Sequence, residues 1–198
     1  MTRDAILEAA AQIFRQKGYH AASMQDIADA VKLQKASLYH HVNSKQEILL
    51  ALLDRALDLL IERMEEVLAL DLPPEEKLRR AILVYLQTML EQRDLSAVLL
   101  LEYRSLDPKC RQQHIQRRDQ YEALWRKLLS EGAEQGIFAV SDIPLICRFL
   151  LGVMNWTVTW YREDGPLTPA QLAHQCANLF LLGLKKRLGE DDRGDRDN

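Results

Sequence analysis

The stretch KASLYHHVNSKQEI, residues 35–48, decides the fold together with the segment that precedes it, SMQDIADAV, residues 23–31. Only residues 32–34 separate the two segments, which leaves room for no more than a tight turn. Two short helices joined by such a turn form a helix-turn-helix, whose second helix enters the major groove of DNA. The second segment has few apolar residues, and Leu38 can anchor it to a core. We therefore predict a DNA-reading helix over residues 35–41.

The composition around this motif predicts an all-helical protein. The chain has 198 residues, 47% of them hydrophobic, and only 8 Gly and 6 Pro interrupt it. β-Branched runs are scarce, which favours helices over strands. No apolar stretch reaches the roughly 18 uninterrupted residues of a membrane span, and the first residues are charged. We expect a cytoplasmic protein with no membrane association and no signal peptide.

The net charge of −3 hides an uneven distribution. Residues 1–45 hold six Lys and Arg against four Asp and Glu, a net charge of +2, and the rest of the chain carries −5. Much of the negative charge lies in GEDDRGDRDN, residues 189–198, which we expect to be a disordered tail. A mildly basic head is compatible with phosphate binding, because local charge decides that interaction.

The chain carries no arrangement of residues typical of an enzyme or a metal site. GxSxG, P-loop and GxGxxG motifs are absent. Cys110 and His114 have a helical i, i+4 spacing that can chelate a metal, but beyond Asp107 or Glu102 no third ligand is evident. We expect no metal, no cofactor and no catalytic residues, and we expect the three cysteines to be reduced thiols.

Helix signals divide the whole chain. Gly18 should end a first helix, and Ser44 to Glu47 forms an S-x-x-E capping box that should open a long connecting helix. The predicted helices cover about residues 2–17, 23–31, 35–41, 44–70, 74–91, 95–106, 109–135, 141–162 and 168–188.

Residues 1–47 resemble the DNA-binding domain of the TetR family of transcriptional regulators. Three departures from the family pattern leave the DNA sequence it reads open. Lys32 replaces a usual turn glycine and should need a positive φ, Gln34 is a poor N-cap, and Val42 replaces a usual Phe. The matching positions are Gly18, Tyr19, Ser23, Ile27, Ala28, Lys35, Ser37, Leu38, Tyr39, His41, Ser44, Lys45 and Glu47.

The resemblance implies an all-α protein with two domains. Residues 1–47 would form a three-helix DNA-binding domain, and residues 48–188 an effector-binding and dimerisation domain. The implied function is a ligand-responsive transcriptional regulator, a repressor that a small apolar effector releases from a palindromic DNA operator. The alternative is a helical interaction protein or ligand carrier, or a helical enzyme, without DNA binding.

The candidate DNA contacts lie in and beside the second helix of the motif. Lysines anchor phosphates, hydroxyl groups bond phosphate oxygens, and Gln is able to read adenine. The alternative is a solvated polar helix face. Thr2 and Arg3 are weaker candidates. The predicted contacts are Ser23, Gln25, Lys35, Ala36, Ser37, Tyr39, His40 and Lys45.

The last two helices are apolar around most of their circumference, which predicts burial in a core or at an interface. By resemblance they pair with their twofold mates in a homodimer; a thick monomer core is the alternative. The predicted interface residues are Phe149, Val153, Trp160, Leu172, Cys176, Leu179, Phe180 and Gly183.

The larger domain is expected to hold an effector pocket. GVMNWTVTWYREDGPLTPAQLA, residues 152–173, resembles C-terminal regions of TetR-type regulators of fatty-acid and steroid degradation, some of which respond to acyl-CoA. Arg162 would then meet a CoA phosphate. Aromatic residues at helical spacing also occur as plain core. The predicted pocket residues are Met89, Leu99, Tyr103, Trp125, Trp156, Trp160 and Arg162.

Overall fold

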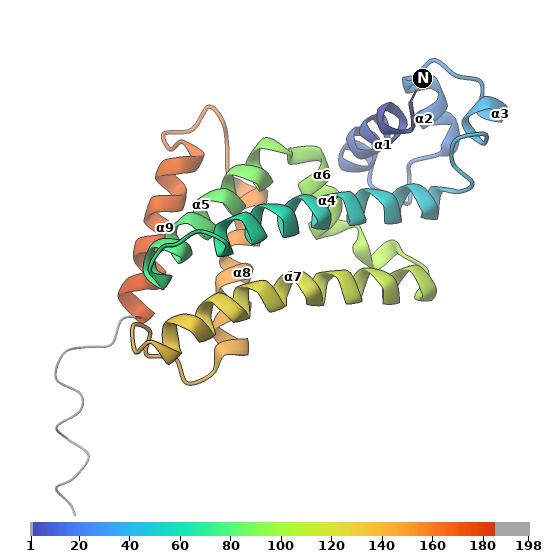
Figure 1. The fold of residues 1–198 in the computed structure, drawn as a ribbon. Helices are drawn as coiled ribbons and strands as arrows, with labels where there is room; N and C mark the ends of the chain where they lie inside the picture. Colours follow the sequence, from blue (N-terminus) through green and yellow to red (C-terminus); the bar gives the residue numbers. More distant parts are fainter. Residues whose placement is uncertain (1, 185–198) are drawn as a thin grey trace, which may run out of the picture.

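The computed structural model describes residues 2–184, and the regular structure in this range is entirely helical, as predicted. The first three helices, α1 (Arg3–Lys17), α2 (Met24–Ala30) and α3 (Lys35–Leu38), form a small head at one end of the molecule (Figure 1). The predicted tail over residues 189–198 lies outside the described residues.

The remaining helices form a larger body. α4 runs from the head through the body, and α7 lies beside it over much of its length (Figure 1). α5 packs along α9, and α8 packs on α7. The elements of the body are α4 (Lys45–Leu68), α5 (Pro74–Glu91), α6 (Arg93–Leu101), the 3-10 helix η1 (Tyr103–Ser105), α7 (Pro108–Glu134), α8 (Ile143–Trp160) and α9 (Pro169–Leu184).

The head has its own set of fully buried residues. Ile6, Ala10 and Phe14 form the inner face of α1, and Ile27 is buried on α2. Gly18 ends α1 with a φ of 77°, in the left-handed region that glycine adopts without strain. The observed bounds of α1 and α2 agree with the predicted bounds to within about two residues.

The reading helix α3 is shorter than predicted. It covers residues 35–38, and a turn over residues 39–41 follows it. The expectations for the two unusual positions before it are confirmed: Lys32 has a φ of 56°, and Gln34 makes no side-chain hydrogen bond as N-cap. After Leu38 the backbone N–H groups of His40 and His41 donate to the carbonyls of Ser37 and Leu38, three residues back, so the chain tightens into a turn, and Val42 is buried in the core directly after it.

Half of the predicted capping box at α4 is wrong. The Ser44 hydroxyl accepts the Glu47 backbone N–H at 3.1 Å, as expected. The Glu47 carboxylate does not return to Ser44; it accepts the backbone N–H of Asn43 at 2.8 Å and pairs with Arg3 at 3.2 Å. The carboxylate thus bonds Asn43, one residue before the N-cap, in place of Ser44. Through its ion pair with Arg3, Glu47 also links the start of α1 to the start of α4.

The single helix predicted over residues 95–106 is also wrong, because it splits into α6 and η1. The carbonyl groups at this break are bonded by side chains from other elements. Arg111 donates to the carbonyl oxygens of Arg104 and Leu106 at 2.7 and 2.9 Å, and Gln46 donates to that of Ser105 at 2.8 Å. These donors satisfy the carbonyls that a continuing helix would use, so the chain can turn here.

α8 is the one helix of residues 2–184 with the length and composition to cross a membrane, with a mean hydropathy of 1.3. Its buried residues, Cys147, Leu150, Met154 and Thr157, follow a helical spacing on the side that packs against the body. Arg148 interrupts the apolar run. α8 is therefore a packed helix of the body with an additional exposed apolar face.

Candidate nucleic-acid interface and effector cavity

The polar residues of α3 and the following turn point away from the core. Lys35, Ala36 and His40 are exposed, and Tyr39 is 44% exposed. Leu38 is fully buried, so it anchors the segment as predicted. α3 lies at the tip of the head, where no part of the body covers it (Figure 1).

Two lysines at α3 have charges that are not paired with a carboxylate of residues 2–184 and are available to bind phosphate. In the head, Arg3, Arg15 and Lys17 each form an ion pair with a carboxylate. Lys32 and Lys35 form no hydrogen bond or ion pair with any of residues 2–184. Sequence analysis treated Lys32 only as a turn residue; its position directly before the reading helix is the signal that it missed.

Lys45 has a different environment from the one predicted. Its ammonium group donates to the carbonyl oxygens of Tyr19 at 2.8 Å and Ala22 at 2.7 Å, and lies 4.3 Å from the centre of the Tyr19 ring. A charge held by two carbonyls and an aromatic face is directed into the head. The structure therefore assigns Lys45 a positioning role in place of the predicted phosphate contact.

The two α2 candidates are both engaged within the helix. The Ser23 hydroxyl caps α2 through Asp26, whose pKa is held well below its usual range by bonds from Lys17 and Ser23. Gln25 is exposed, and its amide donates to Asp29 at 2.7 Å, which leaves its amide oxygen open to solvent. Gln25 thus stays a candidate base contact, whereas Ser23 shapes the start of α2.

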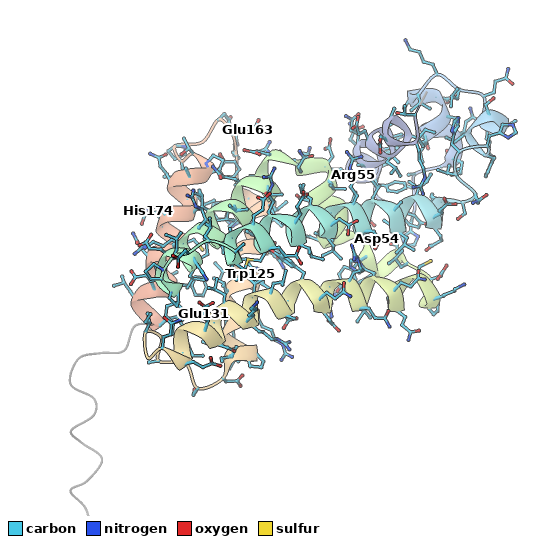
Figure 2. The ribbon with its side chains drawn as sticks, in the orientation of Figure 1. Asp54, Arg55, Trp125, Glu131, Glu163 and His174 are labelled. Atoms are coloured by element: carbon cyan, nitrogen blue, oxygen red, sulfur yellow. The ribbon has the colours of Figure 1, made fainter. Side chains whose placement is uncertain are left out.

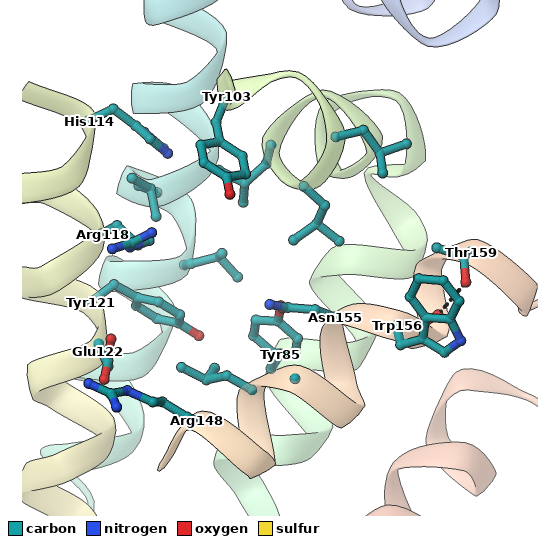
Figure 3. A pocket seen from close by; sticks show the side chains of 17 residues that line it. Tyr85, Tyr103, His114, Arg118, Tyr121, Glu122, Arg148, Asn155, Trp156 and Thr159 are labelled. Atoms are coloured by element: carbon teal, nitrogen blue, oxygen red, sulfur yellow. Dashed lines mark hydrogen bonds between the residues drawn. The ribbon is translucent and has the colours of Figure 1, made fainter. Parts of the chain in front are cut away.

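The body contains a cavity of about 540 Å³ between α4, α5, α6, α7 and α8 (Figure 3). Its floor is buried and its mouth includes Trp156, which is 68% exposed. The lining residues are Leu57, Leu60, Tyr85, Leu99, Leu100, Leu101, Tyr103, His114, Arg118, Tyr121, Glu122, Arg148, Leu151, Gly152, Asn155, Trp156 and Thr159.

Three of the predicted pocket residues, Leu99, Tyr103 and Trp156, line this cavity, and four do not. Met89 is buried elsewhere and accepts a hydrogen bond from the Ser96 hydroxyl. Trp125 projects from α7 into the core of the body, where it is fully buried and its ring makes edge contacts with those of Tyr85 and Tyr121 (Figure 2).

Trp160 and Arg162 lie beyond the mouth of the cavity. Trp160 is half exposed at the end of α8, and Arg162 forms an ion pair with Asp164 at 2.7 Å. Arg162 lies after the end of α8 and is not among the residues that line the cavity. Two other arginines, Arg118 and Arg148, supply the positive charge at the cavity.

Sequence analysis missed the polar groups of the cavity. Burial raises the pKa of the Tyr85 and Tyr121 hydroxyls, so both stay protonated donors near neutral pH. Burial lowers the pKa of His114, so its ring is neutral there. His114 lines the cavity, and no group of three or more potential metal ligands occurs among residues 2–184.

One side chain connects the head to the cavity wall. The Gln46 amide donates to the Ser105 carbonyl at 2.8 Å and accepts the Asp107 backbone N–H at 3.0 Å. Ser105 also contacts the His20 ring of the head at 3.1 Å. Because η1 carries Tyr103 into the cavity, this link joins the cavity to the base of the head.

A second apolar surface covers the outer side of α8 and α9. Five predicted interface residues are exposed or at the surface of this face, and Phe180 is half-buried. Leu172 and Cys176 are only 8% exposed, because the inner face of α9 packs along α5; for these two the predicted interface position is wrong. The exposed members are Phe149, Val153, Trp160, Leu179 and Gly183, to which the structure adds Trp156 and Leu182.

A head with a free reading helix, held to a helical body with a cavity, defines the class of helix-turn-helix transcription regulators that respond to a ligand. The family model for bacterial regulatory proteins of the tetR family matches residues 6–52. The model for the tetracyclin repressor-like C-terminal domain matches residues 71–184. The chain belongs to the TetR family.

Individual relatives extend over nearly the whole chain. The transcriptional repressor KstR2 of Mycobacterium tuberculosis is 31% identical over 186 residues, which is 93% of each protein. Among solved structures, PfmR of Thermus thermophilus is 39% identical with a TM-score of 0.84, over 91% of this chain and 99% of that one. AibR in complex with isovaleryl coenzyme A and operator DNA is 28% identical with a TM-score of 0.83, over 89% and 96%.

Substituting Lys45 tests its positioning role. We expect Lys45→Met to lower the free energy of unfolding by about 1–3 kcal/mol, because two carbonyls lose a charged donor. Urea unfolding followed by circular dichroism measures the change. Lys127→Met, an exposed charge removal on α7, is the matched control and should leave stability unchanged. Equal stability of the two variants would contradict the assigned role.

Proposed function

We propose that the protein is a cytoplasmic, homodimeric, non-enzymatic repressor that binds a palindromic operator and releases it when an acyl-CoA occupies the cavity. Residues 1–47 form the DNA-binding domain and residues 48–188 the effector-binding and dimerisation domain. The observation that carries the proposal is the exposed polar face of α3, with the two free lysines beside it.

The proposed DNA contacts follow from the position of each group. Lys32 and Lys35 bind phosphates, and the Ser37 and Tyr39 hydroxyls bond phosphate oxygens. Further contacts to base edges or phosphates come from Gln25, Ala36 and His40.

Dimerisation is supported by the outer face of α8 and α9. Several large apolar side chains there are more than half exposed, among them Leu179 at 66% and Leu182 at 79%. Large apolar side chains exposed in this number on two helices are typical of a protein interface. A twofold dimer presents two α3 helices to the two halves of a palindrome, which supplies the geometry that operator binding requires.

An acyl-CoA suits the composition of the cavity. Leucine side chains from α4, α6 and α8 line it and can contact an acyl chain, whereas Arg118 and Arg148 can pair with the phosphates of the carrier. Arg148 forms no ion pair with residues 2–184, so its charge is available. The relative AibR was solved with isovaleryl coenzyme A and operator DNA together, which supports the same ligand class here.

Release follows if the ligand binds the DNA-incompetent state more tightly than the competent one. Filling the cavity displaces Tyr103 and with it η1, and the Gln46 link passes this movement to the start of α4. The start of α4 carries the head, so the spacing of the two heads in the dimer changes. Identical head spacing with and without effector would contradict this route.

DNA binding is tested on the protein's own upstream DNA by fluorescence anisotropy over a range of salt concentrations. We expect Tyr39→Ala to abolish operator binding and leave the dimer intact. We expect Lys35→Met to weaken binding and to reduce the slope of log K against log salt by about one unit, because one phosphate contact is lost. Lys127→Met removes a charge far from the head and should change neither. A ligand carrier without DNA function would show no salt-dependent binding in any of these proteins.

The dimer is tested by sedimentation velocity. We expect Leu179→Glu to yield a folded monomer, because the side chain has no partner within its own subunit and a carboxylate in an apolar interface is costly. Leu72→Glu places the same charge on an exposed leucine outside the face and should remain dimeric. Monomeric wild-type protein at micromolar concentration would overturn the homodimer.

The link between cavity and head is tested with Gln46→Ala. We expect operator affinity and effector affinity, each measured alone, to stay within about threefold of wild type, because Gln46 contacts neither ligand. We expect the effector to reduce operator affinity by at most a few fold, against the roughly 5–150-fold typical of coupled sites in the wild type. Full release by effector in the variant would show that the signal takes another path.

A further inference from the structure

The floor of the cavity carries more hydrogen-bonding groups than a plain hydrocarbon chain can use. Tyr85, Tyr103 and Tyr121 enter from α5, η1 and α7, and Asn155 enters from α8 (Figure 3). Tyr85 and Tyr121 are almost fully buried, so water reaches their hydroxyl groups only through the cavity. The polar atoms on this floor therefore indicate which hydrogen-bonding groups a ligand in the cavity should carry.

Asn155 is oriented by Tyr85. The Tyr85 hydroxyl donates to the Asn155 side-chain oxygen, which directs the amide nitrogen of Asn155 toward the remaining space. That nitrogen donates to none of residues 2–184, although Asn155 is half-buried and lines the cavity. Two N–H donors in an apolar site without an acceptor point to an acceptor on the ligand.

Two further residues that line the cavity, Tyr121 and His114, each have a polar atom that donates no hydrogen bond to residues 2–184. Tyr121 is 5% exposed, its hydroxyl donates to none of the described residues, and it points toward the middle of the cavity (Figure 3). His114 is 2% exposed, and its Nδ1 atom is buried with no hydrogen-bond partner in residues 2–184. Leaving the Tyr121 hydroxyl unbonded when a ligand fills the cavity costs free energy, which a ligand with a matched acceptor recovers.

One thioester carbonyl cannot satisfy this set. A carbonyl oxygen has two lone pairs, whereas the floor presents three hydrogen-bond donors, the two N–H groups of the Asn155 amide on α8 and the Tyr121 hydroxyl on α7. We infer that the acyl group of the effector carries an oxygen function of its own, a keto or hydroxyl group, which the Tyr85–Asn155 pair recognises. This inference rests on the proposed function, in which the ligand is an acyl-CoA.

The pair then acts as a selectivity device. A saturated acyl chain would cover Asn155 and Tyr121 without bonding them, whereas an oxygenated chain of the same length would bond them. A site built to hydrogen-bond a substrate group discriminates strongly against the analogue that lacks it. The Tyr85–Asn155 pair therefore distinguishes partly oxidised acyl groups from saturated ones.

The test uses octanoyl-CoA, 3-hydroxyoctanoyl-CoA and 3-oxooctanoyl-CoA, with binding to the full-length protein measured by isothermal titration calorimetry. The variant is Tyr85→Phe/Asn155→Leu, which removes both partners together and leaves no orphaned group. Gln120→Leu removes an exposed amide on α7 outside the cavity and is the matched control. Thermal unfolding verifies that each variant is folded.

We expect the wild type and the control to bind at least one oxygenated thioester about tenfold or more tightly than octanoyl-CoA. In the double variant we expect octanoyl-CoA to bind more tightly than in the wild type and the preference to fall by at least tenfold. The shift for octanoyl-CoA does not depend on where the natural ligand carries its oxygen. A preference that changes by less than about threefold between wild type and double variant overturns the inference.

The outcomes separate this inference from the proposed function. Thioesters that release DNA with an unchanged preference would leave the acyl-CoA function standing and overturn the selectivity. Free octanoic and 3-hydroxyoctanoic acids that show the shift, with no thioester bound, would keep the selectivity and overturn the CoA part. No binding of any of these probes to either protein overturns both.

Discussion

Two neighbouring side chains at the start of α4 hold the head and the body in one frame. Lys45 bonds the carbonyls of the loop between α1 and α2, and Gln46 bonds the backbone on either side of Leu106. One reaches into the reading head and the other into the wall of the cavity. Together with the packing of α1 on α6 and α4, these bonds set the position of the head relative to the cavity. Their chemistry is that of backbone groups at helix ends, which must be bonded by side chains when a helix stops.

Two long helices, α7 and α8, supply most of the cavity wall through residues at helical spacing. On α8 the lining residues run at positions 148, 151, 152, 155, 156 and 159, and on α7 at 114, 118, 121 and 122. These are helical spacings, so each set forms one stripe, and two facing stripes enclose the space. The stripe of α8 next to the cavity is apolar and exposed, so the cavity and the proposed subunit interface lie on neighbouring faces of one helix, with Trp156 on the border between them.

The sequence predicts most of the fold, because spacing and caps carry the information. Gly18, Ser23 and the positive φ of Lys32 follow from local chemistry, and the structure shows each of them. The end of η1 is not determined locally alone, because the carbonyl of Ser105 is bonded by Gln46, which lies 59 residues earlier in the chain. For the same reason the free or bonded state of a lysine is not readable from its neighbours in sequence. Lys35 and Lys45 look alike there, yet only Lys35 is free.

Aromatic content misled the prediction of the pocket. Trp125 and Met89 are large enough to be buried outright, and the core absorbs them. The lining is marked instead by polar residues that interrupt an apolar stripe at helical spacing, such as Arg148 and Asn155 on α8. That pattern is present in the sequence, but it predicts a cavity lining only once the inward-facing side of α8 is known.

α4 also belongs to both cores: its first turns pack with the head and its later turns with the body, and the buried residues form one continuous cluster. The molecule is therefore one cooperative unit in thermal unfolding, without an independently melting head. A ligand that binds only the folded protein raises the stability of the whole unit. Occupancy of the cavity thus makes the reading head harder to melt at the same time as it makes that head a poorer partner for DNA.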